Sequence, residues 1–314
     1  MESPSGDKEF SELRALAARL RRDPVYRASR KKLRAAKRVV PNLLRRVTQR
    51  YRQLPGLVVV GAQKAGTTQL HAGLVRHPRV FGAAAKELQY FSKRSDRPVS
   101  WYRSRFPLSH TVARVGGISV EATPSYLPTP QALRMMGRVL PETRVVVLLR
   151  DPVSRAFSHY QHYKTRHVES RTFPDAIHES IERPLYEPIS GAALASDASP
   201  MLDYVSRGYY ALQLEVLFDE YPRDRVLVID SAELFADTNA VCQQVFAFIG
   251  LDACDVPPKK IHNRGYYRET IDTASAARLR EHYRPHDELL VKLLGRRFRW
   301  MDEPGVSSST PAAA

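Results

Sequence analysis

Residues 57–78, "LVVVGAQKAGTTQLHAGLVRHP", predict a strand, a glycine-containing loop and a helix in direct succession. The run "GLVVVGA" (56–62) is short, rich in β-branched residues and bounded by glycines, which is typical of a buried parallel strand. "TTQLHAGLVRHP" (67–78) has helical spacing until Pro78 ends it. Small residues before a helix let the backbone approach an anion, and the helix start favours negative charge. The unit therefore predicts a site for a phosphate-like group.

The lysine of this loop lies in an unusual place. In nucleoside-triphosphate P-loops the lysine directly follows the second glycine, and a neighbouring hydroxyl binds Mg²⁺. Here Lys64 precedes Gly66 by two residues, and Thr67 and Thr68 follow the glycine. The pattern argues against a simple NTPase, and a glycine turn with a solvated lysine stays open as the alternative to an anion site.

The rest of the chain alternates predicted strands with predicted helices. The strands are expected at 117–123, 143–151 and 225–231, and the helices at 129–140, 152–166, about 201–221, 237–250 and 273–295. This alternation predicts an α/β, P-loop-like three-layer fold with a mostly parallel central sheet flanked by helices. Residues 187–200 are predicted to form a mobile loop, and residues 304–314 a disordered tail.

The positive charge is concentrated at the N-terminus. The chain of 314 residues carries a formal charge of +16, and residues 1–54 contain 16 Lys/Arg and 5 Asp/Glu, a net of +11. Helical spacing broken by Pro24 and Pro41 predicts a basic helical extension at 1–54, before a main domain at 55–303. Such a segment can pack on its own domain and expose a solvated basic face. Alternatively, it can contact an anionic membrane surface or an acidic partner. Nucleic acid is disfavoured because no recognition motif accompanies the charge.

Membrane and cysteine signals are weak. The sequence has no apolar run long enough for a membrane span and no apolar secretory region near its start, so we expect a cytoplasmic chain whose extension can also contact a membrane. Cys242 and Cys254 offer neither a disulfide framework nor a zinc cluster, and the neighbours of Cys242 predict a buried helical position.

A second polar constellation follows the strand predicted at 143–151. In "VVVLLRDPVSRAFSHYQHY" (145–163), Arg150 ends the strand and Ser158 comes eight residues later, about two helical turns into the next helix. A guanidinium and a hydroxyl suit a second phosphate, so the two sites together predict a nucleoside phosphorylated at both ends. The alternative is a Walker-B-like strand whose Asp151 binds Mg²⁺ in a phosphotransferase that uses ATP.

These motifs resemble those of the sulfotransferases that use 3′-phosphoadenosine 5′-phosphosulfate (PAPS). "GAQKAGTT" (61–68) is similar to their 5′-phosphosulfate loop and "LLRDPVSRAFSHY" (148–160) to their 3′-phosphate motif. Further segments resemble, in order, the heparan sulfate sulfotransferase branch and its bacterial relatives, and they lie at 86–107, 120–127, 207–230 and 293–300. The resemblance covers roughly 55–303.

The resemblance implies an in-line sulfuryl transfer that needs no metal and releases adenosine 3′,5′-bisphosphate (PAP). It implies that Glu87, in "KELQYF", is the general base and that Lys64 meets the charge on the departing bridging oxygen. The implied donor-binding residues are Gln63, Lys64, Ala65, Gly66, Thr67 and Thr68 for the 5′ end, Arg150 and Ser158 for the 3′ phosphate, and Tyr209, Arg264 and Gly265. Without the resemblance, Glu87 would be interpreted as an ion-pair partner of a neighbouring base on a solvated turn.

Departures from the family pattern concern the acceptor. Gln89 stands where the 3-O-sulfotransferases have a histidine, Ala122 replaces their lysine before "TPSY", and their cysteine-bridged loop near the C-terminus is missing. These differences favour a bacterial-type enzyme that sulfates a hydroxyl or amine of a sugar, lipid or small molecule. The expected acceptor contacts are Lys86, Gln89, Trp101 and Arg103, although "WYRSRFP" (101–107) is also compatible with an ordinary helix face.

Two functions other than sulfotransferase stay open. One is the ATP- and Mg²⁺-dependent phosphotransferase, and the other is a catalytically inactive basic adaptor. His159 and His162 have helical i, i+3 spacing but no third ligand accompanies them, so packing or surface positions are favoured over a metal site.

Overall fold

The computed structural model describes residues 44–182, 202–256 and 269–302. The chain divides into two compact units, Met1–Tyr51 and Arg52–Ala314. The described part of the first unit is one helical turn at 44–47 and the 3₁₀ helix η1 (Gln49–Tyr51). Most of the predicted extension, the predicted loop at 187–200, the tail at 304–314, and Arg264 with Gly265 lie outside the described residues.

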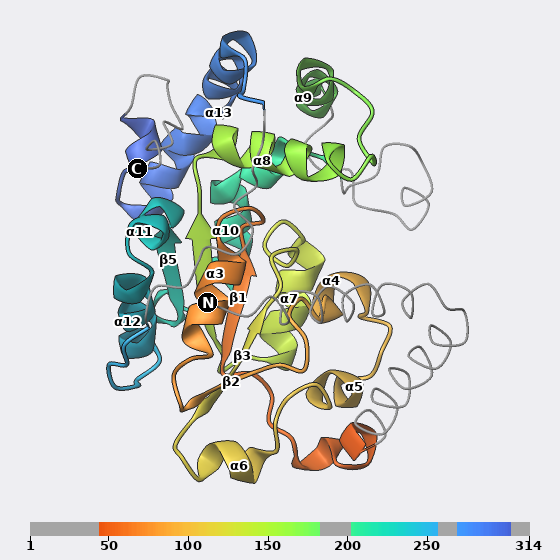
Figure 1. Ribbon diagram of the computed structural model, residues 1–314, viewed down its shortest axis with the longest axis vertical. Coiled ribbons are helices and arrows are strands. Elements are labelled where there is room, and N and C mark those ends of the chain that lie inside the picture. Colours follow the sequence, from red (N-terminus) through yellow and green to blue (C-terminus); the bar gives the residue numbers. More distant parts are fainter. Residues whose placement is uncertain (1–43, 183–201, 257–268, 303–314) are drawn as a thin grey trace, which may run out of the picture. The chain divides into compact units, whose positions relative to one another are not determined.

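The second unit contains a parallel sheet, in the order β2-β3-β1-β4-β5 (Figure 1). The strands are β1 (Leu57–Gly61), β2 (Val80–Gly82), β3 (Ile118–Ala122), β4 (Arg144–Leu149) and β5 (Val226–Asp230), and each described pair is parallel. All five residues of the central strand β1 are buried, as expected for an apolar run covered on both faces. The predicted α/β fold with a parallel central sheet is confirmed.

Helices cover the sheet in two groups. The longer ones are α3 (Thr67–Leu74), α7 (Pro130–Val139), α8 (Pro152–Lys164), α10 (Tyr210–Glu220), α12 (Thr238–Phe248) and α13 (Thr273–Leu294), and a short α11 (Ser231–Ala236) follows β5. Helix α3 packs on α12, whereas α10 packs on both α7 and α13. Cys242 is buried in α12, as predicted, and both cysteines are free thiols. No helix within the described ranges has an apolar stretch long enough to cross a bilayer.

The helix predicted at about 201–221 is wrong in its first half. The Asp203 side chain accepts hydrogen bonds from the backbone N–H groups of Val205 (3.1 Å) and Ser206 (2.9 Å), which favours a turn over a helix. A 3₁₀ turn, η4 (Ser206–Gly208), follows, and Tyr209 has φ −78° and ψ 65°, outside the helical region. Helix α10 therefore begins only at Tyr210.

Several short elements have no clear sequence signal. They are β2, α4 (Tyr90–Lys93), α5 (Val99–Arg103), α6 (Ser109–Ala113) and α9 (Phe173–Glu182), together with the 3₁₀ turns η5 (Arg223–Arg225) and η6 (Arg299–Met301). Most of them have five residues or fewer, so hydrophobic periodicity cannot distinguish them, and tertiary contacts stabilise them.

The strand order determines where the predicted motifs meet. After β1 the chain continues to β2 and β3 on one side of β1, and then crosses to β4 on the other side. In open parallel sheets, ligands bind beyond the carboxyl ends of the strands where the direction reverses. In Figure 1 the arrowhead of β1 points toward α8, the helix that follows β4. The loop after β1 and the residues after β4 are therefore neighbours at this edge.

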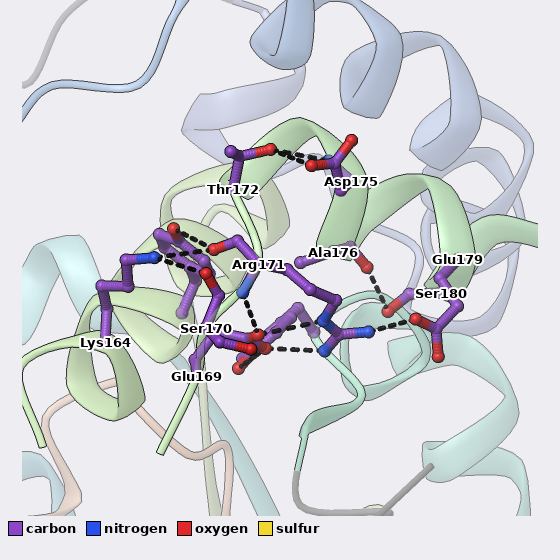
Figure 2. Close-up of polar contacts among 11 residues, drawn as sticks. Lys164, Glu169, Ser170, Arg171, Thr172, Asp175, Ala176, Glu179 and Ser180 are labelled. Carbon is purple, nitrogen blue, oxygen red and sulfur yellow. Dashed lines mark hydrogen bonds and ion pairs between the residues drawn. The ribbon is translucent and has the colours of Figure 1, made fainter. Parts of the chain in front are cut away.

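A buried ion-pair network stabilises the connection between α8 and α9 (Figure 2). The Glu169 carboxylate is buried and accepts hydrogen bonds from Arg171 Nη2 (2.6 Å) and from the Tyr204 hydroxyl (2.8 Å). Arg171 also pairs with Glu179 of α9. Burial alone would raise the pKa of Glu169, but the hydrogen bonds from Arg171 and Tyr204 lower it to about 2.

Replacing Glu169 by Gln is expected to lower the free energy of unfolding by about 3 kcal/mol at neutral pH, because it removes the buried counter-charge of the half-buried Arg171 guanidinium. The folded carboxylate keeps its charge down to about pH 2, while the unfolded one is protonated near 4.5. The stabilisation is therefore lost as the pH falls through this window, and the variant and wild type should converge. Urea unfolding at several pH values measures the difference. In the control Glu179→Gln the side chain is 47% exposed, so the loss should be under about 1 kcal/mol.

Candidate active site

The first loop connects β1 to α3 and has an unusual backbone. Lys64 has φ 73° and Gly66 has φ 92°, both in the left-handed region. A Cβ atom at Gly66 would lie 2.8 Å from Leu234 and 3.0 Å from Phe235, so only glycine fits both the conformation and the space. Gln63, Lys64 and Thr68 are half-buried, whereas Ala65 and Thr67 are buried. The loop thus presents backbone N–H groups and the Lys64 side chain at the start of α3.

Arg150 connects this loop to the second predicted motif. Its Nη1 atom donates a hydrogen bond to the Lys64 carbonyl oxygen (2.9 Å), and its own carbonyl accepts from the Tyr210 hydroxyl (2.8 Å). Ser158 lies buried on α8, two helical turns beyond Arg150. Residues 86 positions apart in the sequence therefore form one polar region, in which the guanidinium of Arg150 also orders the loop.

Asp151 has a structural role that conflicts with the Walker-B alternative. Its carboxylate caps α8 by accepting from the N–H groups of Val153 (3.2 Å) and Ser154 (3.1 Å). It also pairs with Arg280 of α13 (2.8 Å). A carboxylate already engaged by two amides and a guanidinium is a poor ligand for Mg²⁺.

His162 is a site residue that the sequence did not reveal. Its Nδ1 atom lies 3.5 Å from Lys64 Nζ, and its Nε2 atom lies 2.6 Å from Arg166 Nη1. Burial lowers the pKa of His162, and the positive charges of Lys64 and Arg166 lower it further, to about 4, against an opposing effect of Glu87. The imidazole is therefore neutral at physiological pH, and because it then has a single acceptor nitrogen, it can accept a hydrogen bond from either Lys64 or Arg166 but not from both.

The pKa of His162 gives a direct test of this geometry. In Lys64→Met its midpoint should rise above about 4, yet stay below 6.5, because one cation is removed while burial is unchanged. In Glu87→Gln the midpoint should fall, because the carboxylate that favours the imidazolium is lost. Heteronuclear NMR of the imidazole C–H groups against pH measures both shifts. Equal midpoints in wild type and both variants would contradict the contacts described.

Glu87 faces the same region from the loop between β2 and α4. Glu87 and Gln89 both have left-handed backbones, with φ 60° and 52°. The Glu87 N–H donates to the Ala122 carbonyl (3.1 Å), and the carboxylate, 45% exposed, pairs with Lys86 Nζ (2.8 Å). The negative charge of Glu87 also opposes the lowering of the pKa of His162, the neighbour of Lys64. The tertiary structure thus places a solvent-accessible carboxylate near an ammonium.

The remaining predicted residues are less central. Trp101 packs near Tyr90 and lies under the guanidinium of Arg105, 4.4 Å from its ring centre, while Arg103 is half-buried at the end of α5. Tyr209 contacts α13, because its hydroxyl lies 2.7 Å from His282 Nε2 and its ring stacks on His286.

Arg207, two residues before Tyr209, contacts the first loop. Its Nη1 atom donates to Gln63 Oε1 (3.1 Å). It begins the segment "RGYY" (207–210), so the signal was present, although nothing local distinguishes its role from that of Tyr209.

Metal ligation has no support among the residues that are described. In these ranges no group of three or more His, Cys, Asp or Glu side chains is arranged to bind a metal ion. His159 is buried against the rings of Tyr163 and Tyr204, and burial, followed by the nearby cations Arg207, Arg155 and Lys64, holds its pKa well below the usual value. Burial is the main cause of both lowered pKa values, and the surrounding cations lower them further, so positive charge that suits an anionic ligand surrounds these two imidazoles.

Comparisons with known proteins identify the family. The sulfotransferase domain family matches residues 54–283. Human heparan sulfate glucosamine 3-O-sulfotransferase 3B1 is 26% identical over 272 residues, which cover 79% of this chain and 65% of the relative. Human bifunctional heparan sulfate N-deacetylase/N-sulfotransferase 3 is 29% identical over 207 residues, covering 63% of this chain and 22% of the relative. The match thus spans less than two thirds of the length of either relative.

A solved structure leads to the same family. The crystal structure of a sulfotransferase from Alicyclobacillus acidocaldarius superposes with a TM-score of 0.62 at 25% identity, over 79% of this chain and 99% of that one. The family match includes the first loop, Glu87, Arg150 and Ser158, and it extends over most of the chain. The resemblance noted from the motifs is therefore confirmed, and the chain belongs to the sulfotransferase domain family.

Proposed function

We propose that this chain transfers a sulfuryl group from PAPS to a hydroxyl or amine of a sugar, lipid or small-molecule acceptor, with Glu87 as the general base. The observation that carries the proposal is the convergence of Lys64, Arg150 and Glu87 from three separate segments on one electropositive edge of the sheet. The family to which the chain belongs supports the reaction class.

The donor fits the residues that are present. The N–H groups at the start of α3 and the Lys64 ammonium suit the 5′-phosphosulfate, since glycine at position 66 keeps that approach free of a side chain. Arg150 and Ser158 suit the 3′ phosphate, with Arg150 contributing a charged donor fork. Gln63, Ala65, Thr67 and Thr68 belong to the same loop, and Arg207 positions the Gln63 side chain. Tyr209, Arg264 and Gly265 stay predicted donor contacts.

In the proposed chemical step, the sulfuryl group moves directly from PAPS to the acceptor and PAP is released. The acceptor oxygen or nitrogen forms a bond to sulfur while the bond from sulfur to the bridging phosphate oxygen breaks. Glu87 accepts the proton of the acceptor, and Lys64 stabilises the negative charge that develops on the bridging oxygen. The neutral imidazole of His162 lies 3.5 Å from the Lys64 ammonium, and its single acceptor nitrogen serves either Lys64 or Arg166.

The acceptor is expected to differ from that named for the heparan sulfate relatives. Ala122, which stands where the 3-O-sulfotransferases have a lysine, is fully buried and offers no charge. Gln89 replaces a histidine beside Glu87. The proposed acceptor contacts are Lys86, Gln89, Trp101 and Arg103. This set suits an acceptor that carries less negative charge than heparan sulfate, as expected for a bacterial-type enzyme.

The nucleotide preference tests the proposal against its enzymatic rival. Isothermal titration should show tight binding of PAP that is independent of Mg²⁺, with much weaker binding of ATP. An ATP preference that requires Mg²⁺ would favour the phosphotransferase instead. The role of Asp151 as a helix cap and partner of Arg280 already argues for the first outcome.

A product screen tests the reaction itself. The protein is incubated with PAPS and 4-nitrophenol, a long-chain alcohol, a glycolipid or desulfated heparan sulfate oligosaccharides, and mass spectrometry detects a gain of one sulfuryl group. Transfer to any of these supports the enzyme. Tight PAP binding without transfer to any acceptor class would support the inactive adaptor.

The basic extension at 1–54 is proposed to contact an anionic membrane surface or an acidic partner, because it carries a net charge of +11. Sedimentation with vesicles containing phosphatidylserine should retain the full chain at low salt and release it at high salt. Deletion of residues 1–50 should abolish this binding and leave PAP affinity unchanged. Retention on neutral vesicles alone would contradict an electrostatic contact.

A further inference from the structure

A fully buried carboxylate lies directly beneath the loop that carries Glu87. Glu121, on β3, has no exposed surface and accepts hydrogen bonds from three hydroxyl groups. Thr123 Oγ1 (2.8 Å) and the Tyr126 hydroxyl (2.7 Å) donate to its Oε1 atom, and the Tyr102 hydroxyl donates to Oε2. Burial raises the pKa of Glu121, and the three hydroxyl donors oppose this effect and offset the cost of burying the carboxylate.

Two of these hydroxyls continue to the backbone beside Glu87. Thr123 Oγ1 accepts from the N–H of Gln89 (3.4 Å), and the Tyr126 hydroxyl accepts from the N–H of Tyr90 (2.9 Å). Tyr102 differs, because it contacts this loop through its ring, which stacks on Tyr90 with centres 4.5 Å apart. The carboxylate therefore acts on the loop through two of its three partners.

The direction of these hydrogen bonds depends on Glu121. A hydroxyl has one proton, and when that proton is donated to a carboxylate, its lone pairs are left to accept from a backbone N–H. The charged acceptor also polarises the hydroxyl and strengthens the second bond. Without the carboxylate, the hydroxyls of Thr123 and Tyr126 would be free to rotate away from this role.

The loop needs such support because its backbone is strained. Glu87 and Gln89 both have positive φ, a conformation that residues other than glycine keep only where their surroundings determine it. Such strain is concentrated at functional sites, and here it determines the direction in which the Glu87 side chain leaves the loop.

We infer that Glu121 is a positioning residue for the reaction: through Thr123 and Tyr126 it fixes the turn at 87–90 and so aims the Glu87 carboxylate at the acceptor. The inference rests on the proposed role of Glu87 as the base. It assigns to Glu121 no contact with donor or acceptor.

A matched pair of variants tests this role. Tyr126→Phe and Tyr102→Phe each remove one buried hydroxyl donor from Glu121, but only the first also removes an acceptor of the loop. With 4-nitrophenol and desulfated heparan sulfate oligosaccharides as acceptor probes, Tyr126→Phe should lower kcat by roughly tenfold to 100-fold, because a small misplacement of a catalytic group is this costly. Tyr102→Phe should stay within about twofold of wild type, and PAP affinity should be unchanged in both, since neither hydroxyl contacts the first loop.

A double-mutant cycle separates positioning from general destabilisation. In a Glu87→Gln background the loss of kcat caused by Tyr126→Phe should disappear, while any loss of thermal stability should persist. Glu121→Gln keeps an amide oxygen as acceptor, so it should retain more activity than Glu121→Ala. If Tyr126→Phe does not fold, Thr123→Val removes the other acceptor and takes its place in the cycle.

Amide hydrogen exchange provides a measurement that needs no acceptor. The N–H groups of Gln89 and Tyr90 should exchange faster in Tyr126→Phe and not in Tyr102→Phe. Equal effects of the two variants on kcat, or a loss that persists in the Glu87→Gln background, would overturn the inference. If Glu87→Gln transfers sulfate as fast as wild type, the proposed base is wrong, whereas selective exchange at Gln89 and Tyr90 would still support the positioning of the turn.

Discussion

Glu87→Gln is expected to lower kcat for transfer to an aliphatic alcohol by about 100-fold to 10,000-fold, the range typical of losing a general base. The substitution keeps the size of the side chain and removes its ability to accept the proton. The affinity for PAP should change little, because Glu87 is proposed to contact the acceptor rather than the nucleotide. Initial rates at saturating PAPS measure the effect.

The identity of the acceptor sharpens this test. 4-Nitrophenol is more acidic than an aliphatic alcohol and depends less on a general base. Glu87→Gln should therefore lower kcat less with 4-nitrophenol than with the alcohol. Lys86→Met separates the base from the ion pair, because it removes the 2.8 Å contact and leaves the carboxylate in place. If Lys86→Met lowers kcat as much as Glu87→Gln does, the ion pair between Lys86 and Glu87, rather than proton transfer to Glu87, is required for the reaction. Unchanged rates in Glu87→Gln would remove Glu87 from the mechanism.

Arg150→Ala is expected to weaken PAP binding by at least about 100-fold, because a charged hydrogen bond contributes roughly 1.5–3 kcal/mol and the guanidinium offers more than one. The variant also removes the bond from Arg150 Nη1 to the Lys64 carbonyl, so the first loop loses support. Isothermal titration with PAP and with adenosine 5′-monophosphate, which lacks the 3′ phosphate, separates the two effects. The loss for PAP should be clearly the larger.

Two control variants complete this measurement. Arg150→Lys keeps the charge but not the planar fork, so its affinity for PAP should lie between wild type and Arg150→Ala. Arg225→Ala removes an exposed pair with Glu142 outside the site and should leave PAP binding unchanged. Equal losses for PAP and the monophosphate in Arg150→Ala would show that Arg150 acts only by ordering the loop.

The sheet and its principal motifs were predictable from local pattern. Strands β1, β4 and β5 contain continuous apolar runs, whereas β3 is interrupted by Ser119 and Glu121, and α3, α7, α8, α12 and α13 were predicted close to their observed bounds. The helix before β5 was predicted too long, because the capping side chain of Asp203 and the conformation of Tyr209 interrupt it. Short elements such as α4 and α5 contain too few residues for periodicity to appear.

The site was predictable only in part, for the same physical reason. Lys64, Arg150, Ser158 and Glu87 lie in motifs, and the structure brings Lys64, Arg150 and Glu87 to one region. His162 and Arg207 lie inside quoted segments, but no local pattern marks either as a neighbour of the first loop. Their contacts with Lys64 and Gln63 join residues 98 and 144 positions apart. The prediction named Tyr209 in the segment 207–210, and Arg207 is the side chain of that segment that contacts the first loop, through Gln63.

Local chemistry was therefore sufficient to predict the fold class and to propose an anion site at the first loop and a second phosphate site after β4, because each depends on residues a few positions apart. Strand order, the neutral His162 and the support of Glu87 by Glu121 depend on packing between distant segments. Burial and neighbouring charges set the pKa of His162, and three hydroxyls from two segments surround Glu121. These are properties of a folded interior, where water is excluded and charges act strongly on one another.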